Sequence, residues 1–244
     1  MLTPRIFVGD APSAPAPGAD YPLSEAAARH VGHALRMRVG DRLALFTGRG
    51  GEYAATIARI ERRAVTLRVE AHDAVERETP APVTLVQAVI AADMMDLIVR
   101  KAVELGAAAI APVLAARSQH VPAERIARRL AHWRQIAIAA CEQCGRNRVP
   151  DVHAVTTLSA WIAGTAEPVA VLDASAGRSL AEFALTAAPR AIAVGPEGGF
   201  APEELRLAVD RGATLVHLGR RVLRAETAAL AALATVDAVA GDAR

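Results

Sequence analysis

Apolar and polar residues alternate in several short runs along the first seventy positions of the chain. Alternation with a period of two is typical of half-buried β-strands, and the runs are separated by glycine-rich or charged turns. A helical stretch begins at Leu23, with Ser24 as the expected N-cap, and continues to about Leu35. The Pro- and Ala-rich stretch Ala11–Asp20 is expected to be a loop. Such closely spaced strands favour a small β-barrel over residues 1–72; they are expected at Arg5–Val8, Arg42–Phe46, Glu52–Ile60 and Ala64–Ala71.

The pattern changes after a polar linker at residues 73–82. The run Val83–Ile90 is continuously apolar, as expected of a strand that is buried on both faces. Helical patterns follow at Asp93–Leu105 and Pro122–Cys144, and a last one at Ala225–Ala240. This alternation of strands and helices predicts an α/β domain with a mostly parallel sheet over residues 83–244. Its other strands are expected at Ala109–Leu114, Val169–Leu172, Ala191–Val194 and Thr214–Leu218.

The net charge is only +2 over 244 residues, so the overall charge does not indicate a nucleic-acid partner. Residues 100–148, however, contain nine Lys or Arg residues against three acidic ones, an excess of six. This excess can form a phosphate-facing patch, or it can be the solvated face of a helix. No uncharged apolar run approaches the roughly 18 residues of a membrane span, and the first residues lack the apolar core of a signal peptide. We therefore expect a cytoplasmic protein without a membrane partner.

Both cysteines lie in the motif Cys141-Glu142-Gln143-Cys144. A zinc site would need two further ligands, and no second C-x-x-C or H-x-x-x-H is present to supply them. A thioredoxin-like motif would lie at a strand-to-helix junction, whereas this one ends a helical pattern. Two small buried thiols without a metal are the favoured interpretation.

Two loops in the carboxyl-terminal third each follow an apolar run and precede a helical pattern. They are Val194–Phe200, with the sequence VGPEGGF, and Leu218–Ala228, with the sequence LGRRVLRAETA. Loops at the carboxyl ends of parallel strands are where open α/β sheets bind ligands. Glycines allow backbone to approach a ligand closely, although a tight strand-to-helix turn would explain them equally well. Neither a P-loop nor a G-x-G-x-x-G motif is present, which disfavours a nucleotide-phosphate site.

The amino-acid sequences of these two loops closely resemble the corresponding motifs of the RsmE family of SPOUT-class RNA methyltransferases. The stretches 30–41 (HVGHALRMRVGD) and 100–106 (RKAVELG) also follow this family. The resemblance implies a PUA-like RNA-binding barrel followed by an α/β domain whose carboxyl end forms a trefoil knot. It implies S-adenosylmethionine (SAM) as cofactor, N3 of a uridine in small-subunit (16S) ribosomal RNA as target, and a homodimer. Cys144 departs from the family, which usually has serine there.

The resemblance also implies roles for particular residues. The knot loops would bind SAM through Leu172, Gly195, Pro196, Glu197, Gly198, Gly199, Leu218, Gly219, Leu223, Arg224, Thr227 and Ala228. Arg224 is the first candidate for stabilising the uridine anion, because arginine stays charged and donates a fork of hydrogen bonds. Glu197 and Glu226 are candidate bases, and the sequence does not decide between them. The candidate RNA contacts are Arg5, Arg36, Arg38, Lys101, Arg117, Arg146, Asn147, Arg148 and Arg220.

Two other functions remain compatible with the sequence. One is a different SPOUT enzyme, for example a transfer-RNA ribose methylase. The PUA-like segment and the LGRRVLRAETAA motif nevertheless favour the base-methylating family. The other is a non-catalytic RNA-binding or ribosome-assembly factor that keeps the fold. Binding of SAM would distinguish an enzyme from a simple binder.

Overall fold

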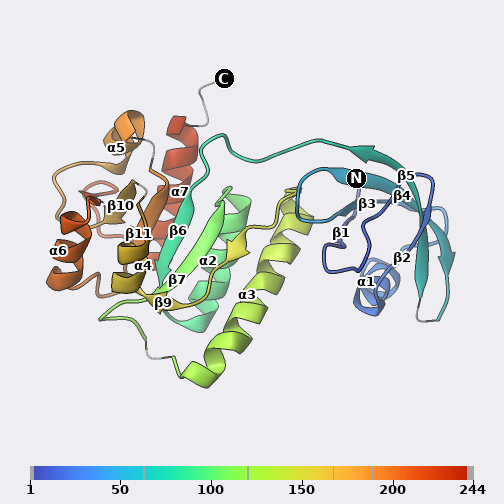
Figure 1. Cartoon of the computed structure of the whole chain (residues 1–244), viewed down its shortest axis with the longest axis horizontal. Coiled ribbons are helices and arrows are strands. Elements are labelled where there is room, and N and C mark those ends of the chain that lie inside the picture. The colour runs from blue at the N-terminus through green and yellow to red at the C-terminus, as the bar shows by residue number, and fades with distance from the viewer. Residues whose placement is uncertain (1–2, 63, 120, 167, 188, 241–244) are drawn as a thin grey trace. The chain divides into compact units, whose positions relative to one another are not determined.

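The computed structural model describes residues 3–62, 64–119, 121–166, 168–187 and 189–240 (Figure 1). Its internal contacts divide the chain into two compact units. Unit 1 comprises residues 1–78 together with Cys141–Val149, and unit 2 comprises residues 79–140 and 150–244. The first break falls inside the expected linker. The sequence pattern predicts Cys141–Val149 as part of the second domain, whereas the contacts of this segment belong to unit 1.

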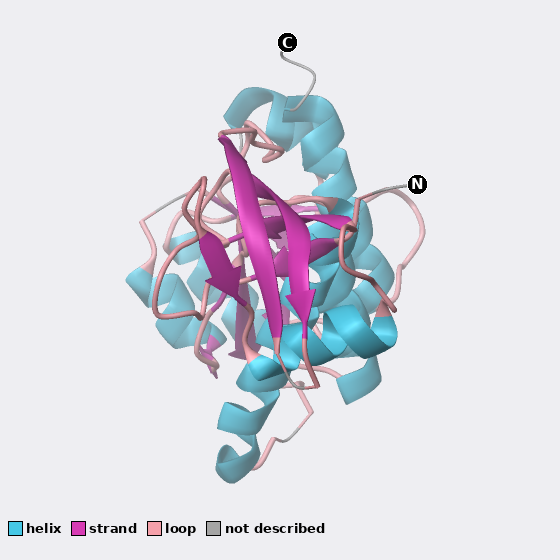
Figure 2. Cartoon of the chain, turned by 90° about the vertical axis from the view of Figure 1, so that its right-hand side faces the viewer, coloured by secondary structure: helices cyan, strands magenta, loops and turns pink. Residues whose placement is uncertain are grey.

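Unit 1 is built on a five-stranded sheet, whose long antiparallel strands are visible in Figure 2. The strand order is β1-β3-β4-β5-β2, and only the β1–β3 pair is parallel. Two register shifts between β4 and β5 bend this ladder into its barrel-like form. The strands are β1 (Arg5–Phe7), β2 (Asp20–Pro22), β3 (Arg42–Phe46), β4 (Glu52–Ile60) and β5 (Val65–Asp73).

The expected helix of unit 1 is present, but its second half is wound differently. Ser24 caps α1 (Glu25–Arg29) by accepting a hydrogen bond from the Ala27 amide at 3.3 Å. The next turn, η1 (His30–Ala34), is π-helical, and it ends just before Arg36, whose φ is +53°. β2 was not expected as a strand, because Pro22 lacks an amide donor and is tolerated only at a sheet edge.

Unit 2 has a seven-stranded sheet in which all pairs between named strands are parallel, as expected for this domain. The order is β12-β10-β11-β6-β7-β8, and β9 also pairs with β7. The strands are β6 (Thr84–Ala88), β7 (Ala109–Leu114), β8 (Asp151–Val152), β9 (Thr156–Thr157), β10 (Val169–Leu172), β11 (Ala191–Val194) and β12 (Thr214–Val216).

Helices cover both faces of this sheet. They are α2 (Ala92–Glu104), α3 (Ala123–Cys144), α4 (Leu158–Gly164), α5 (Leu180–Ala187), α6 (Pro202–Asp210) and α7 (Ala225–Ala240). Side chains of α4 and α6 share an apolar cluster with every second residue of the strands, such as Val86 and Ala193. Because side chains alternate across a strand, the intervening residues face the layer in which α7 packs against α2 and α5.

Candidate functional site

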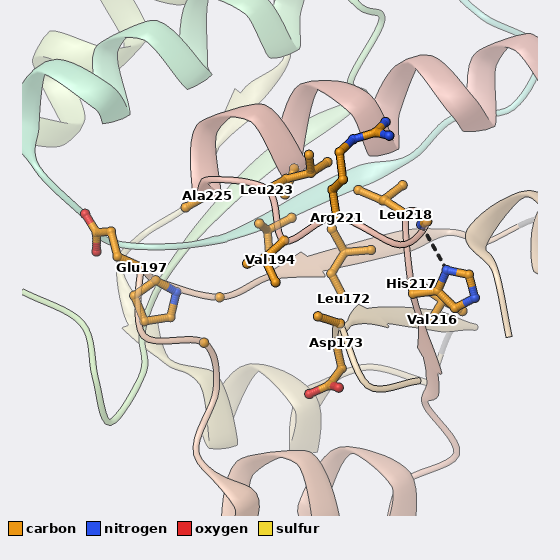
Figure 3. Close-up of a pocket in the computed structure, with 17 residues that line it drawn as sticks. Leu172, Asp173, Val194, Glu197, Val216, His217, Leu218, Arg221, Leu223 and Ala225 are labelled. Carbon is orange, nitrogen blue, oxygen red and sulfur yellow. Dashed lines mark hydrogen bonds between the residues drawn. The ribbon is translucent and has the colours of Figure 1, made fainter. Parts of the chain in front are cut away.

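Three neighbouring strand ends of unit 2 meet at one cavity (Figure 3). β12, β10 and β11 are adjacent in the sheet, and the loop after each of them contributes to the wall. Side chains of Leu172, Val194 and Leu218 converge from these three strand ends, while the charged ends of Asp173 and Arg221 point away from the apolar centre. The site is therefore an apolar slot bordered by backbone, which suits a flat aromatic base.

Nine of the twelve residues predicted to bind the cofactor lie on the cavity wall: Leu172, Gly195, Pro196, Glu197, Gly199, Leu218, Gly219, Leu223 and Ala228. Gly198, Arg224 and Thr227 are not among the lining residues. The wall also contains residues that the sequence did not single out as ligands: Asp173, Ala174, Val194, Val216, His217, Arg221, Val222 and Ala225. Several of these directly follow or end an expected strand, so proximity to a strand end could have identified them.

The backbone conformation of the two loops requires glycine at three positions. Gly199 and Gly219 have φ values of +69° and +111°, a region that favours glycine. A Cβ on Gly195 would lie only 3.1 Å from the Phe200 amide nitrogen, across the tight turn. These three glycines thus let two turns fold close to the cavity without side chains.

Gly198 has a different environment from the one that the sequence suggests. A Cβ at this position would meet the Arg117 side chain at 3.3 Å, and the Arg117 guanidinium donates to the Gly198 carbonyl oxygen at 2.6 Å. The absence of a side chain at Gly198 therefore accommodates Arg117. A substitution there would disturb this arginine before it reached a ligand in the cavity.

Local hydrogen bonds fix two other parts of the wall. Nδ1 of His217 accepts a hydrogen bond from the Gly219 amide at 2.9 Å, which holds the loop after β12. The carboxylate of Asp173 accepts from the amide of Ser175 at 2.7 Å, forming a turn after β10. Both contacts preorganise the wall from within their own loop.

The three predicted catalytic residues differ in their positions relative to the cavity. Glu197 lines it and is exposed, although its carboxylate points away from the apolar centre in Figure 3. Arg224 is exposed and precedes α7, where its carbonyl oxygen accepts from the Ala228 amide at 2.8 Å. Glu226 is half-buried in the first turn of α7. Of the three, only Glu197 lines the cavity, and the chemical roles of all three stay predictions.

Most of the predicted RNA contacts are accessible. Arg36, Arg38, Arg117 and Arg220 are exposed, and Arg148 has a side chain that is 54% exposed. Lys101 is half-buried and pairs with Glu104, three residues further along α2, at 2.7 Å. All of them except Lys101 are exposed to solvent, and their role in binding RNA stays a prediction.

Arg5, Arg146 and Asn147 are engaged inside unit 1. Arg146 is 5% exposed and forms an ion pair with Glu78, and the Asn147 side chain is fully buried, donating to the Val75 carbonyl at 2.9 Å. Arg5 donates to the Arg146 carbonyl at 3.1 Å, and also to Asn147. The prediction that these residues face RNA phosphates therefore needs correction, because their donors hold the segment Gly145–Val149 in place.

Arg5 also affects the pKa of Glu52. Burial alone would raise the pKa of Glu52, but hydrogen bonds and charge from Arg77 and Arg5 outweigh it and lower this pKa from 4.5 to about 2. The guanidinium of Arg77 donates to Glu52 at 3.0 Å and to the Gly145 carbonyl at 3.0 Å. Glu52 thus stays ionised and holds together the two arginines beside the segment Gly145–Val149.

The cysteine motif occupies the last turn of α3, as predicted. Cys141 is buried, and burial raises the pKa of its thiol to about 12, so the thiol stays protonated and is a poor nucleophile and metal ligand. Cys144 is only half-buried, which differs from the expectation of two buried thiols. Within the described part of the chain, no cluster of three or more His, Cys, Asp or Glu side chains could hold a metal ion. No helix among these residues is long and apolar enough to cross a membrane.

Comparisons with known proteins agree with both units. A family model described as an RNA methyltransferase domain matches residues 77–237, and one described as an RNA methyltransferase PUA domain matches residues 23–70. The ribosomal RNA small subunit methyltransferase E of Mycobacterium bovis is 34% identical, with 85% of this chain and 82% of the relative covered. The enzyme of the same name from Synechocystis sp. is 30% identical, with 89% and 72% covered.

Two solved structures are similar over the whole chain. The ribosomal RNA small subunit methyltransferase E from Neisseria gonorrhoeae, solved with SAM bound, has a TM-score of 0.91 and 32% identity, with full coverage of both chains. A protein from Legionella pneumophila, also solved with SAM, has a TM-score of 0.93 and 36% identity, with 99% of this chain and 100% of that chain covered.

Proposed function

Because this chain belongs to the RNA methyltransferase family, with a PUA domain at its amino-terminal end, we propose that it methylates N3 of a uridine in small-subunit ribosomal RNA, using SAM. The observation that carries the proposal is the apolar cavity where the loops after β10, β11 and β12 meet. Two relatives with the same fold over their full length were solved with SAM bound. The loops of this chain have the glycines and apolar side chains that such a ligand needs.

The cavity residues fit the parts of SAM. Leu172, Leu218 and Leu223 offer apolar contact to an adenine ring, and the backbone around Gly195 and Gly219 can approach the ligand closely. Bound SAM supplies a methyl group on a positively charged sulfur. The protein needs no metal for this chemistry, and alignment of the acceptor nitrogen with the methyl carbon supplies much of the rate.

Arg224 is proposed to stabilise the uridine as it loses its N3 proton. N3 is a poor nucleophile while it carries that proton, and the negative charge of the anion spreads onto the two carbonyl oxygens. A guanidinium can donate to such an oxygen and stays charged at any working pH. The backbone of Arg224 is held at the start of α7, and no described contact engages its side chain, which is exposed. The proton acceptor is proposed to be Glu197, which lines the cavity, or Glu226, in the first turn of α7.

Unit 1 is proposed to bind RNA and to leave cofactor binding to unit 2. Arg36 and Arg38 are exposed on unit 1, and Arg148 carries its exposed guanidinium on the segment Gly145–Val149. The left-handed backbone of Arg36 follows the π-turn η1, and both features are common where a backbone is shaped for binding.

The quaternary state, the knot and the cellular location are proposed together. We infer a homodimer in the cytoplasm, because the family resemblance implies one and Val222, beside the cavity, is an apolar side chain that is 85% exposed. The trefoil knot is inferred from the same resemblance. It is supported by α7, which follows β12 at one edge of the sheet and packs against the more central β11 and β6.

Two experiments test the function. Mass-spectrometric mapping of small-subunit ribosomal RNA should find one uridine unmethylated in cells that lack the protein, and a fully modified RNA would refute the proposal. In vitro, Arg224→Ala should reduce turnover on saturating RNA by roughly 100-fold or more, as when a charge-stabilising donor is removed. Its RNA affinity should change little. Arg220→Ala in the same loop is the matched control, expected to weaken RNA binding while turnover at saturation persists.

A further inference from the structure

Gln87 is a polar residue in the apolar interior of unit 2. It lies on the central strand β6, is 0% exposed, and is the only fully polar side chain among the buried described residues of this unit. Its amide nitrogen donates to the Ala88 carbonyl at 2.9 Å, whereas its carbonyl oxygen Oε1 has no hydrogen-bond partner among the described atoms. Buried carbonyl groups are normally paired, and an unpaired one destabilises the fold, so this oxygen requires an explanation.

The register of the sheet places Gln87 directly behind the wall of the cavity, although Gln87 itself is not one of the lining residues. Gln87 lies opposite Val194 of β11, and Val194 lines the cavity. Val86 and Ala88 face the layer of α4, so Gln87 faces the other layer, to which α7 belongs. On its other side Gln87 is in register with Pro112 of β7, which has no amide hydrogen to donate. Among the described atoms, no neighbour on either strand donates a hydrogen bond to the Gln87 oxygen.

The direction of the cavity suggests what could pair with this oxygen. The cavity crosses the strand ends from β12 through β10 to β11, and β6 is the next strand in the same order. Leu172 ends β10 and Leu218 follows β12, so these two side chains lie on the β10 and β12 side of the wall, where they suit an adenine ring. An elongated ligand that places its adenine there directs its other end toward β11 and β6.

We propose that Gln87 is a positioning residue for the cofactor, and that its Oε1 accepts a hydrogen bond from the ammonium group of the methionine part of SAM. This inference rests on the proposed use of SAM in this cavity. An ammonium has three donors and no acceptor, so it requires oxygens around it. Glu197 also borders this end of the cavity, but its carboxylate points away from the centre in Figure 3. An uncharged acceptor can remain buried in the ligand-free protein more easily than a carboxylate can.

The test compares two ligands that share the adenosine part. S-adenosylhomocysteine carries the ammonium group, and 5′-methylthioadenosine lacks the amino-acid part altogether. Affinities of the full-length protein are measured by calorimetry for the wild type and for Gln87→Met, which keeps the size of the side chain but removes the acceptor. Leu85→Met is the control for repacking, because Leu85 is equally buried and lies on the same strand and face, but its register partner Ile192 does not line the cavity.

Gln87→Met should weaken S-adenosylhomocysteine binding by roughly tenfold to a hundredfold, the range for a hydrogen bond to a charged group. Its affinity for 5′-methylthioadenosine should not change. The melting temperature of the ligand-free variant should change little, because the substitution removes the unpaired buried carbonyl together with the hydrogen bond to Ala88. Leu85→Met should leave the ratio of the two affinities unchanged.

Three results would overturn the role of Gln87. They are unchanged S-adenosylhomocysteine affinity, an equal loss for both ligands, and a clearly lower melting temperature of the ligand-free variant, since the last two indicate a structural role. Failure of the wild-type protein to bind either ligand would instead refute the proposed cofactor site, so the two failures are distinguishable.

Discussion

The segment Gly145–Val149 is held in unit 1 by two arginine–glutamate pairs that differ in burial, and this difference gives a quantitative prediction. The side chains of Arg146 and Glu78 are 6% and 23% exposed, whereas those of Arg148 and Glu76 are 54% and 38% exposed. Glu78→Ala removes the counter-charge that Glu78 supplies to the buried guanidinium of Arg146. Glu76→Ala leaves Arg148 in water, where it is well solvated.

Breaking a buried ion pair by removing one partner costs about 3–5 kcal/mol, and an exposed pair contributes about 1 kcal/mol or less. Because Glu78 is partly exposed, we expect Glu78→Ala to destabilise unit 1 by about 3 kcal/mol. With a urea dependence of about 2 kcal/mol per molar, the midpoint of unfolding should fall by roughly 1.5 M. Glu76→Ala should lower it by roughly 0.5 M or less.

The aromatic residues allow the two units to be followed separately. Tyr21 and Tyr53, the two tyrosines of the chain, lie in unit 1, and its two tryptophans, Trp133 and Trp161, lie in unit 2. Tyrosine absorbance should therefore show the large shift in Glu78→Ala, while tryptophan fluorescence should shift much less. Equal midpoints for the two variants in tyrosine absorbance would refute the assignment of Arg146 as a buried structural cation.

Three further predictions follow from the same structure. The pKa of Glu52 in the folded protein, about 2, lies below its ordinary value of 4.5, so Glu52 contributes stability that is complete above pH 4.5 and is lost as pH falls toward 2. In Glu52→Gln, the loss of stability measured by urea unfolding between these pH values should become shallower, and an unchanged profile would contradict the pairing with Arg5 and Arg77. In salt titrations of RNA binding, Arg148→Gln should make the log–log slope shallower by roughly 0.7 to 0.9, whereas equal slopes for Arg148→Gln and Arg146→Met would show that burial does not separate them. His217→Phe removes the acceptor that holds the Gly219 amide, so SAM affinity measured by calorimetry should fall by roughly tenfold, and unchanged affinity would show that this contact does not shape the site.

The regular elements could largely be predicted from the sequence. The strands β3, β4, β7, β10 and β11 and the helix α7 have the expected bounds, since each combines a clear periodicity with a turn or cap signal. The two-residue strands β8 and β9 were not expected, because so short a segment has no periodicity and becomes a strand only through its pairing with β7.

The candidate site could be predicted in part. The two glycine-bearing loops were located because glycine and proline leave a local signal in the sequence. That Gly198 faces Arg117 depends on a contact between residues 81 positions apart. The position of Gln87 beside Val194 likewise depends on the pairing of β6 with β11, which no local pattern specifies.

The sequence by itself determined the linker that ends the amino-terminal unit, the parallel α/β character of the second unit, and the loops at which its cavity lies, because these follow from local periodicity, turn chemistry and family resemblance. Only the tertiary structure decided which arginines face solvent and which are buried. Arg146 and Arg148 are two positions apart in one basic stretch, yet one is enclosed against Glu78 and the other is largely exposed beside Glu76. The burial of each arginine depends on residues about 70 positions away in the sequence that fold against it. The charge of an arginine does not predict which distant residues will pack against it.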